Sequence, residues 1–171
     1  TVIITQARLG STRLPGKVLK EINNKTLLQI HLERLVQCKF VSDIIVATTT
    51  KAEDEIIYLK SLEWGFHASK GSETDVLDRY FQTAMNSNAD WVVRVTSDCP
   101  LIDPNLIDKI VTKFLDSKLD YLSNCDPATF PDGLDVEVFT YGALKEASIN
   151  ATLPSQREHV TPYIRNNKDL L

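Results

Sequence analysis

The stretch that decides the fold is residues 1–17, TVIITQARLGSTRLPGK, in which a short apolar run leads directly into a basic segment. Val2–Thr5 is rich in β-branched residues, which predicts a strand. Gln6–Lys17 then carries two glycines, two arginines and a lysine. These are the ingredients of a phosphate-binding loop. The opening therefore predicts a strand that ends in an anion-binding loop.

Further strand candidates recur along the whole chain, and helical segments separate them. This alternation, with short connections, implies an α/β fold whose mostly parallel sheet is covered by helices on both faces. The chain is expected to be a single domain over residues 1–171. The predicted strands are Val2–Thr5, Asp43–Thr48, Phe66–Ala68, Asp90–Thr96, Tyr121–Ser123 and Val136–Thr140.

Helix starts are indicated by capping residues. Asp103-Pro104 is typical of an N-cap followed by proline at the first helical position. Ser72 or Thr74 is expected to cap a helix over Val76–Met85. Three segments fit the capping-box pattern, namely Thr26–Gln29, Thr50–Glu53 and Ser155–Glu158.

Three polar stretches follow predicted strands and are expected to converge. They are Gln6–Lys17, Ser69–Asp75 and Ser97–Asp103. In a parallel sheet, ligands bind beyond the carboxyl ends of the strands, where the loops leading into helices begin. The sequence therefore predicts one crevice that all three stretches line.

The opening loop differs from a Walker A loop, which reads G-x-x-x-x-G-K-[ST]. Five residues separate its two glycines, and Val18 stands where the magnesium-binding hydroxyl should be. Gly10 allows close backbone approach to an anion, Ser11 and Thr12 can donate hydrogen bonds, and Arg13 and Lys17 add positive charge. The alternative is a solvated basic surface loop.

Asp98 is the candidate metal ligand. It falls at the end of a predicted strand, facing the basic loop, and Mg²⁺ is commonly held by one or two carboxylates together with phosphate oxygens. The alternative is a turn-forming aspartate. Asp103, five residues later, is better explained as a helix cap.

Composition excludes several classes of protein. With 43% hydrophobic and 25% charged residues the chain is typical of a globular protein, and no apolar run approaches a membrane span. The formal net charge of −4 argues against nucleic-acid binding. Three well-separated cysteines suggest neither a zinc site nor a disulfide framework. A cytoplasmic protein with no membrane partner is expected. The chain lacks an initiating methionine, which suggests part of a longer polypeptide.

Five blocks, in order, closely resemble the cytidylyltransferase family that includes spore coat polysaccharide biosynthesis protein F. They are QARLGSTRLPGKVL, GSETDVLDRY, TSDCPLIDP, DGLDVEVF and REHVTPYIRN. A more distant resemblance is to the CMP-Kdo and CMP-sialate synthetases. The resemblance implies a three-layer, Rossmann-like nucleotidyltransferase fold. It also implies transfer of CMP from CTP to a sugar or sugar-like acceptor, with release of pyrophosphate.

The resemblance also implies residue roles. Asp98 matches the carboxylate that holds Mg²⁺ in the family, although Ser97 replaces the usual glycine before it. Arg13 and Lys17 would neutralise the departing phosphates. The implied nucleotide-binding residues are Ala7, Arg8, Gly10, Ser11, Arg13, Lys17 and Asp75, and for Asp75 a helix cap is an equal alternative.

Four further residues would face the acceptor: Asp132, Asp135, Glu137 and His159. The acids could instead be turn and edge charges, and a lone histidine is often structural. Members of the family continue into a C-terminal block with a candidate second metal ligand, and this chain lacks that block. A non-catalytic domain that binds nucleotide or a partner protein is therefore the rival hypothesis. A glycosyltransferase is further behind, because SDCP lacks a D-x-D motif. Dimerisation is common in the wider family, so a homodimer is also expected.

Overall fold

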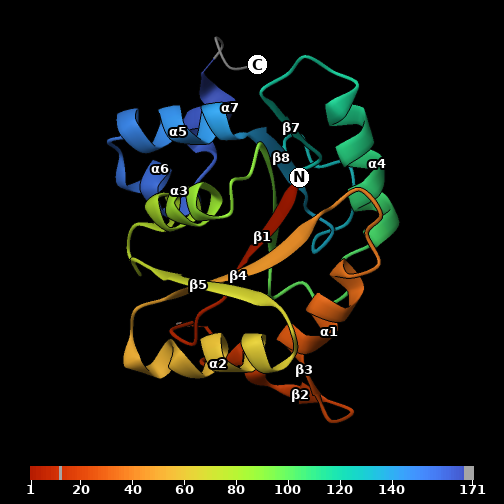
Figure 1. The fold of residues 1–171 in the computed structure, drawn as a ribbon, viewed down its shortest axis with the longest axis vertical. Helices are drawn as coiled ribbons and strands as arrows, with labels where there is room; N and C mark the ends of the chain where they lie inside the picture. Colours follow the sequence, from red (N-terminus) through yellow and green to blue (C-terminus); the bar gives the residue numbers. More distant parts are fainter. Residues whose placement is uncertain (12, 168–171) are drawn as a thin grey trace.

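The computed structural model describes residues 1–11 and 13–167. Its centre is a six-stranded sheet in the order β5-β4-β1-β6-β8-β7 (Figure 1). The strands are β1 (Val2–Gln6), β4 (Asp43–Thr49), β5 (His67–Gly71), β6 (Trp91–Thr96), β7 (Tyr121–Ser123) and β8 (Glu137–Thr140). A separate small hairpin joins β2 (Glu21–Ile22) to β3 (Lys25–Thr26).

The sheet is mostly parallel, as predicted. β1 lies between β4 and β6 and pairs with both in parallel, and β5 continues the parallel arrangement beyond β4. β8 is antiparallel to both of its neighbours, β6 and β7. All six predicted strands are present, with ends that differ by at most three residues. The carboxyl ends of the parallel strands therefore share one edge, where the predicted crevice should lie.

Helices cover both faces of the sheet, which confirms the three-layer arrangement (Figure 1). One face carries α1 (Leu27–Leu35), α2 (Glu55–Glu63) and α4 (Pro104–Leu115). The other face carries α3 (Val76–Asn86), α5 (Tyr141–Asn150), α6 (Pro154–His159) and α7 (Pro162–Asn166). Two 3₁₀ turns, η1 (Lys17–Leu19) and η2 (Ala52–Asp54), lie in the connections.

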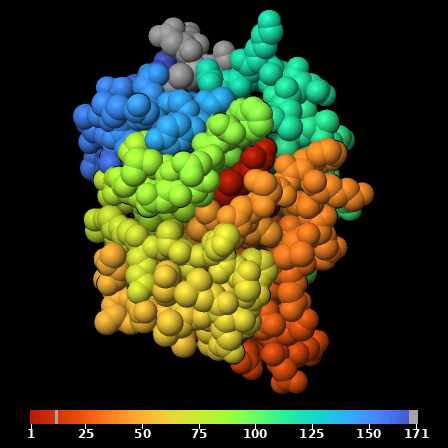
Figure 2. All heavy atoms as spheres, viewed as in Figure 1, coloured from red at the N-terminus to blue at the C-terminus, as the bar shows by residue number. Residues whose placement is uncertain are grey.

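The strand β1 is apolar because both of its faces are buried. Ile4 packs into the core under α3 and α5, and Ile3 into the core under α1 and α4. In Figure 2 the red atoms of the chain's start show only as a small patch ringed by later segments. Within the described part of the chain, no helix has both the length and the apolar character needed to cross a bilayer.

Helix capping agrees with the sequence at two sites. The Thr26 hydroxyl accepts from the Gln29 N–H at 3.1 Å, and the Asp103 carboxylate accepts from the Asn105 N–H at 2.9 Å, directly before Pro104. For α3 the predicted cap at Ser72 or Thr74 is wrong, and the alternative for Asp75 is confirmed, because Asp75 is the N-cap and accepts from the Asp78 N–H. Ser72 supports this cap by accepting from the Asp75 N–H.

The other two predicted capping boxes are wrong. After Thr50 the chain first forms η2, and the helix α2 begins only at Glu55. Pro154 takes the first helical position of α6, so the N-cap is Leu153, whose N–H donates to the Gln156 side chain at 3.1 Å. Proline fixes this start because it needs no N–H partner there.

A buried histidine ties the sheet to α1 and makes stability dependent on pH. His31 Nδ1 donates to the Cys99 carbonyl at 2.9 Å, so Nε2 accepts from the Thr5 hydroxyl at 3.1 Å. Burial lowers the pKa of His31 from the ordinary 6.5 to about 4, against the opposing effects of the Cys99 carbonyl and Asp98.

We expect stability to fall as the pH drops through this window. Between pH 6.5 and about 4 the unfolded chain binds a proton at His31 that the folded chain excludes. This linkage destabilises the fold by about 3 kcal/mol at the lower end, and the contribution is absent above pH 6.5. Urea unfolding across this range measures the effect. The decline should shrink in His31→Gln and persist in His67→Gln, and an unchanged decline in His31→Gln would contradict the assignment.

Candidate active site

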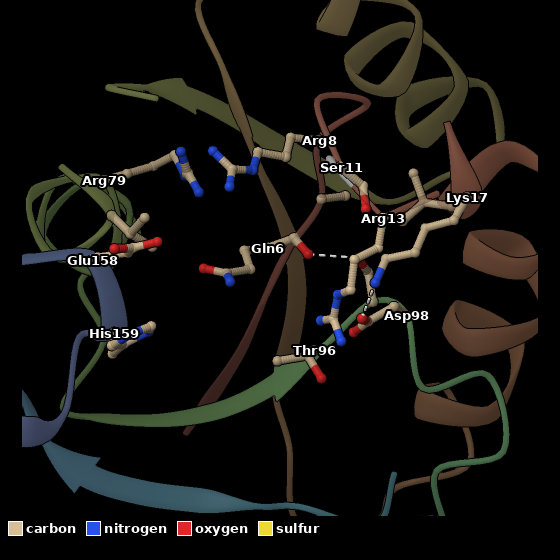
Figure 3. Close-up of a pocket in the computed structure, with 14 residues that line it drawn as sticks. Gln6, Arg8, Ser11, Arg13, Lys17, Arg79, Thr96, Asp98, Glu158 and His159 are labelled. Carbon is tan, nitrogen blue, oxygen red and sulfur yellow. Dashed lines mark hydrogen bonds and ion pairs between the residues drawn. The ribbon is translucent and has the colours of Figure 1, made fainter. Parts of the chain in front are cut away.

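A cleft of about 330 Å³ opens at the carboxyl ends of β1 and β6. Its walls are the loop after β1 on one side and α3 and α6 on the other (Figure 3). The lining residues are Gln6, Ala7, Arg8, Ser11, Arg13, Lys17, Val18, Val76, Arg79, Thr96, Ser97, Asp98, Glu158 and His159.

Most of the predicted site residues meet in this cleft. The structure brings together Ala7, Arg8, Ser11, Arg13, Lys17, Asp98 and His159. Gly10 belongs to the same loop but does not line the cleft, and neither do Asp75 and Asp132. Thr12, predicted as a further donor, lies outside the described residues.

Internal hydrogen bonds give the loop after β1 its shape. The Leu9 carbonyl accepts from the Ser11 N–H at 2.7 Å and from the Gly16 N–H at 2.9 Å. Gly16 has φ 67°, a left-handed conformation that glycine adopts without strain. Lys17 then begins η1, whose Val18 is buried in the core. The loop is therefore folded back on itself and held at its end by buried Val18, which fixes the position of the Lys17 backbone.

Asp54 fastens the beginning of the same loop. Its carboxylate is 1% exposed and accepts from the Leu9 N–H at 2.7 Å and from the Thr49 hydroxyl. We expect Asp54→Ala to cost about 1–3 kcal/mol of unfolding free energy, because the Leu9 N–H loses its partner. Nucleotide affinity should fall with it, since the loop loses its anchor.

Urea unfolding and calorimetric titration with CTP measure these two effects. Glu53→Ala is the matched control, because Glu53 is the exposed acidic neighbour. Equal losses in the two variants would contradict a specific role for Asp54.

Lys17 and Asp98 form an ion pair on one side of the cleft, opposite α3 and α6 (Figure 3). Burial raises the pKa of Asp98, but the hydrogen bond and charge of Lys17 outweigh it, and Thr96 helps to hold the pKa below its usual range. Next to it, the Ser97 hydroxyl donates to the Gln6 carbonyl at 2.5 Å, which ties the ends of β1 and β6 together. The pair is therefore held at the sheet edge.

The opposite wall contains Arg79, which the sequence analysis missed. Arg79 lies on α3 and is 2% exposed. The only sequence signal is its spacing, because Arg79 follows Val76 by three positions and so lies on the same helix face, but the sequence does not show that the arginine is buried there. Gln6, Thr96, Ser97 and Glu158 are the other polar lining residues that were not predicted.

Asp75 has a structural role in the wall formed by α3 and α6. Besides capping α3, its carboxylate accepts two-point hydrogen bonds from Arg157 of α6, with the shortest distance 2.6 Å. Arg157 also donates to the Ser148 carbonyl at 2.7 Å. Asp75 therefore joins α3 to α6, the two helices of this wall, and its role in nucleotide binding stays a prediction.

A second cleft, of about 260 Å³, adjoins the first. It shares Thr96 and His159 with the first cleft and contains two of the predicted acceptor residues, Asp135 and Glu137. Its remaining lining residues are Arg94, Val95, Cys125, Thr161, Pro162 and Arg165. Asp132 is exposed and outside both clefts.

The Glu137 carboxylate is occupied by protein partners. It is 4% exposed, pairs with the Arg94 guanidinium, and accepts from the Tyr121 hydroxyl at 2.7 Å and the Thr161 hydroxyl at 2.6 Å. Asp135 is partly exposed, and burial together with the charges of Asp132 and Glu137 raises its pKa. Of these two acids, Asp135 is the better placed to contact a ligand.

His159 is presented to both clefts by a strained turn. Val160, directly after it, has φ 71° and ψ −60°, and the Thr161 N–H donates to the His159 carbonyl at 2.9 Å. This is a γ-turn with positive φ, which is rare for a β-branched residue. The fully buried Val160 side chain and the bond from Thr161 to Glu137 hold the turn in place. Such strain is often found at functional sites.

Comparison with known proteins identifies the family of the chain. The family model described as Cytidylyltransferase matches residues 2–171. The chain belongs to the cytidylyltransferase family. Its fold is close to that of a cytidylyltransferase from Leptospira borgpetersenii, with TM-score 0.93 and 38% identity, covering 98% of this chain and 72% of that one.

Curated relatives of this cytidylyltransferase support the same family. An uncharacterized protein of Methanocaldococcus jannaschii is 46% identical, covering 98% of this chain and 68% of that protein. Spore coat polysaccharide biosynthesis protein SpsF of Bacillus subtilis is 36% identical, covering 99% of this chain and 71% of that protein. The more distant resemblance to the CMP-Kdo synthetases is also confirmed, since 3-deoxy-manno-octulosonate cytidylyltransferase of Solibacter usitatus is 36% identical, covering 63% of this chain and 42% of that protein.

Proposed function

We propose that this cytidylyltransferase transfers CMP from CTP to a sugar or sugar-like acceptor in polysaccharide biosynthesis, with Mg²⁺ as its metal. The observation that carries the proposal is that Arg8, Arg13, Lys17 and Asp98 line one cleft, with Lys17 paired to Asp98. An acceptor oxygen attacks the α-phosphorus, and the bond from that phosphorus to the bridging oxygen breaks. Pyrophosphate leaves with that oxygen, and the acceptor proton passes to solvent.

The basic residues would bind the triphosphate and the leaving pyrophosphate. Phosphoryl transfer is catalysed mainly by positioning and by charge stabilisation, so fixed cations are the expected catalytic parts. Arg13 and Lys17 come from one loop and reach toward Asp98 and Thr96 in Figure 3. Arg8 adds a third positive charge, and its guanidinium lies 3.9 Å from Glu73.

The residues around Asp98 suit a magnesium ion carried largely by phosphate oxygens. No group of three or more potential metal-ligating acids, histidines or cysteines occurs in residues 1–11 and 13–167. Asp98 alone would therefore hold Mg²⁺ on the protein side, which is the arrangement common for nucleotide-bound magnesium. When bound, the ion supplies charge neutralisation at the phosphates. Lys17, released from Asp98, would then be free to contact phosphate.

The second cleft would hold the acceptor. It adjoins the first cleft through Thr96 and His159, so a hydroxyl bound there can reach the nucleotide. Asp135, Arg165 and His159 offer it polar and charged contacts. The names of the relatives suggest polysaccharide biosynthesis and an acidic sugar such as 3-deoxy-manno-octulosonate as the first acceptor to try.

Thermal unfolding with each of CTP, UTP, ATP and GTP, with and without Mg²⁺, tests the proposal. A ligand that binds the folded state raises the melting temperature by mass action, even if turnover is slow. CTP with Mg²⁺ should give the largest rise, and the effect of Mg²⁺ should disappear in Asp98→Ala but not in the exposed control Asp116→Ala.

Pyrophosphate release with acceptor present then separates catalysis from binding. Release that depends on both CTP and acceptor supports transfer. CTP binding without any release favours the rival hypothesis of a domain that only binds nucleotide. No rise with any nucleotide would overturn the proposal.

A further inference from the structure

Arg79 is a buried charge with little compensation from the protein. Its Nη1 donates to the Ser72 carbonyl at 2.5 Å, while Nε is buried without a hydrogen-bond partner. Among residues 1–11 and 13–167, no carboxylate lies within 4.0 Å of its guanidinium nitrogens. Burial, before any other influence, lowers the pKa of Arg79. A buried charge with no opposite charge beside it is unfavourable, so its position in the wall of a cleft points to a ligand.

Gln6 presents a second unpartnered atom to the same cleft. Its Oε1 is buried and accepts no hydrogen bond from the part of the chain that the structure describes. In Figure 3 the Gln6 amide and the Arg79 guanidinium point into the half of the cleft away from the Lys17–Asp98 pair. An unpartnered donor, on Arg79, and an unpartnered acceptor, on Gln6, therefore lie on the side of the cleft opposite the Lys17–Asp98 pair, where phosphate is expected to bind.

The surroundings of these two groups suit a flat polar ring better than a phosphate. Val76 and Ala7, both lining residues, supply apolar surface. Glu158 and Arg8 both point into the same half of the cleft in Figure 3, so the negative charge of Glu158 offsets the attraction of Arg8 for a phosphate there. Apolar walls with a few placed polar groups are typical of pockets that bind heterocyclic ligands.

We propose that Arg79 and Gln6 read the base of the nucleotide, Arg79 donating to the ring nitrogen N3 and O2 of cytosine and Gln6 accepting from its N4 amino group. This inference rests on the proposed function, because it requires CTP in the cleft. Cytosine presents an acceptor and an amino donor on its pairing edge. Uracil presents N3–H and O4 at the places of N3 and the amino group, so the contact at N3 would bring donor to donor and the contact of Gln6 acceptor to acceptor, while the contact at O2 would be kept.

Gly71 fixes the position of Arg79. A Cβ at Gly71 would lie 2.8 Å from Arg79 Cγ, closer than such atoms approach in proteins, and only 3.0 Å from Arg79 Cβ. The strand β5 must therefore end in glycine for the arginine stem to pack against it. Gly71→Ala should displace the guanidinium without removing it, which gives an independent way to disturb the pair.

Calorimetric titration with CTP, UTP and inorganic tripolyphosphate tests the inference. The wild-type chain should bind CTP more tightly than UTP. The ratio of the two dissociation constants should fall about tenfold or more in Arg79→Lys, Gln6→Met and Gly71→Ala, while tripolyphosphate binding stays the same. Arg34→Lys and Gly142→Ala are the matched controls, because Arg34 bonds the Ile102 carbonyl and Gly142 has room for a Cβ.

Each outcome separates this inference from the function on which it rests. If CTP and tripolyphosphate bind and the variants keep the preference for CTP, Arg79 and Gln6 do not read the base. If Arg79→Lys weakens CTP, UTP and tripolyphosphate equally, Arg79 binds phosphate, and the inference is also wrong. Failure of the wild-type chain to bind any of the three would overturn the proposed function itself. Should Arg79→Lys fail to fold, Gln6→Met alone decides.

Discussion

Replacing Lys17 with methionine is expected to lower kcat/KM for CTP-dependent pyrophosphate release by about 10²–10³-fold, the usual effect of removing one preorganised charge from a transition state. Lys17 is placed by the loop that Leu9 and Gly16 close, and it pairs with Asp98 at the sheet edge. Methionine keeps an unbranched side chain of nearly the same length and removes the charged ammonium group with its hydrogen-bond donors. Most of the loss should appear in kcat, because negative charge on the leaving pyrophosphate grows in the transition state.

Lys20→Met is the matched control for this prediction. Lys20 lies three residues further along, is exposed, and does not line the cleft. Its substitution should leave kcat/KM within a factor of about two, since it removes only a distant surface charge. A steady-state assay of pyrophosphate release compares the two variants. Similar losses would mean that general positive charge, and not the position of Lys17, supports the reaction.

The fold could be predicted from the sequence because the central strands have apolar surroundings on both faces. Strands such as β4 and β6 are buried on both faces, so their β-branched residues form runs that stand out from the helices. Helix starts were harder to predict, since capping depends on which local donor is nearest. Thr49, not Thr50, accepts from the Lys51 N–H, and Pro154 moved the start of α6.

One side of the candidate site could be predicted from the sequence and the other could not. Its loop side was predicted because Arg13, Lys17 and Asp98 lie within short segments that follow strands, so their neighbourhood follows from strand order alone. Its α3 side was not, because Arg79 and Gln6 gain their meaning from burial. A charged residue on a helix is ordinary until the structure shows it 2% exposed and facing a cleft.

Acidic residues show a further limit of sequence reasoning. Asp75 and Glu137 were predicted to face ligands, and both carboxylates have protein partners in the structure. Sequence alone cannot distinguish an acid that pairs with a distant arginine from one that is free. The partners, Arg157 and Arg94, are 82 and 43 positions away along the chain. The roles of both acids toward ligands therefore stay predictions that need separate tests.

Glu137→Gln is expected to destabilise the fold by about 3–5 kcal/mol, the range for breaking a buried ion pair on one side. Glutamine has nearly the same shape and can still accept from Tyr121 and Thr161. It removes the charge that compensates Arg94, whose side chain is only 16% exposed and whose Nε already has no hydrogen-bond partner among the described residues. Burial lowers the pKa of Arg94, but the charge and hydrogen bond of Glu137 raise it, and the net shift of the pKa is upward. Urea unfolding at neutral pH measures the loss.

Asp135→Asn is the matched control, because it makes the same acid-to-amide change at a carboxylate without an ion-pair partner among the described residues. Asp135 lines the same cleft, and the substitution is again acid to amide, but burial and its acidic neighbours raise the pKa of Asp135. Its charge is therefore unfavourable in the folded state, and losing it should leave the unfolding free energy unchanged or slightly higher. If Glu137→Gln were as mild as Asp135→Asn, the carboxylate of Glu137 would not be committed to the fold. It could then serve the acceptor, and the hydroxyl of Thr161 that now binds it would be free to do the same.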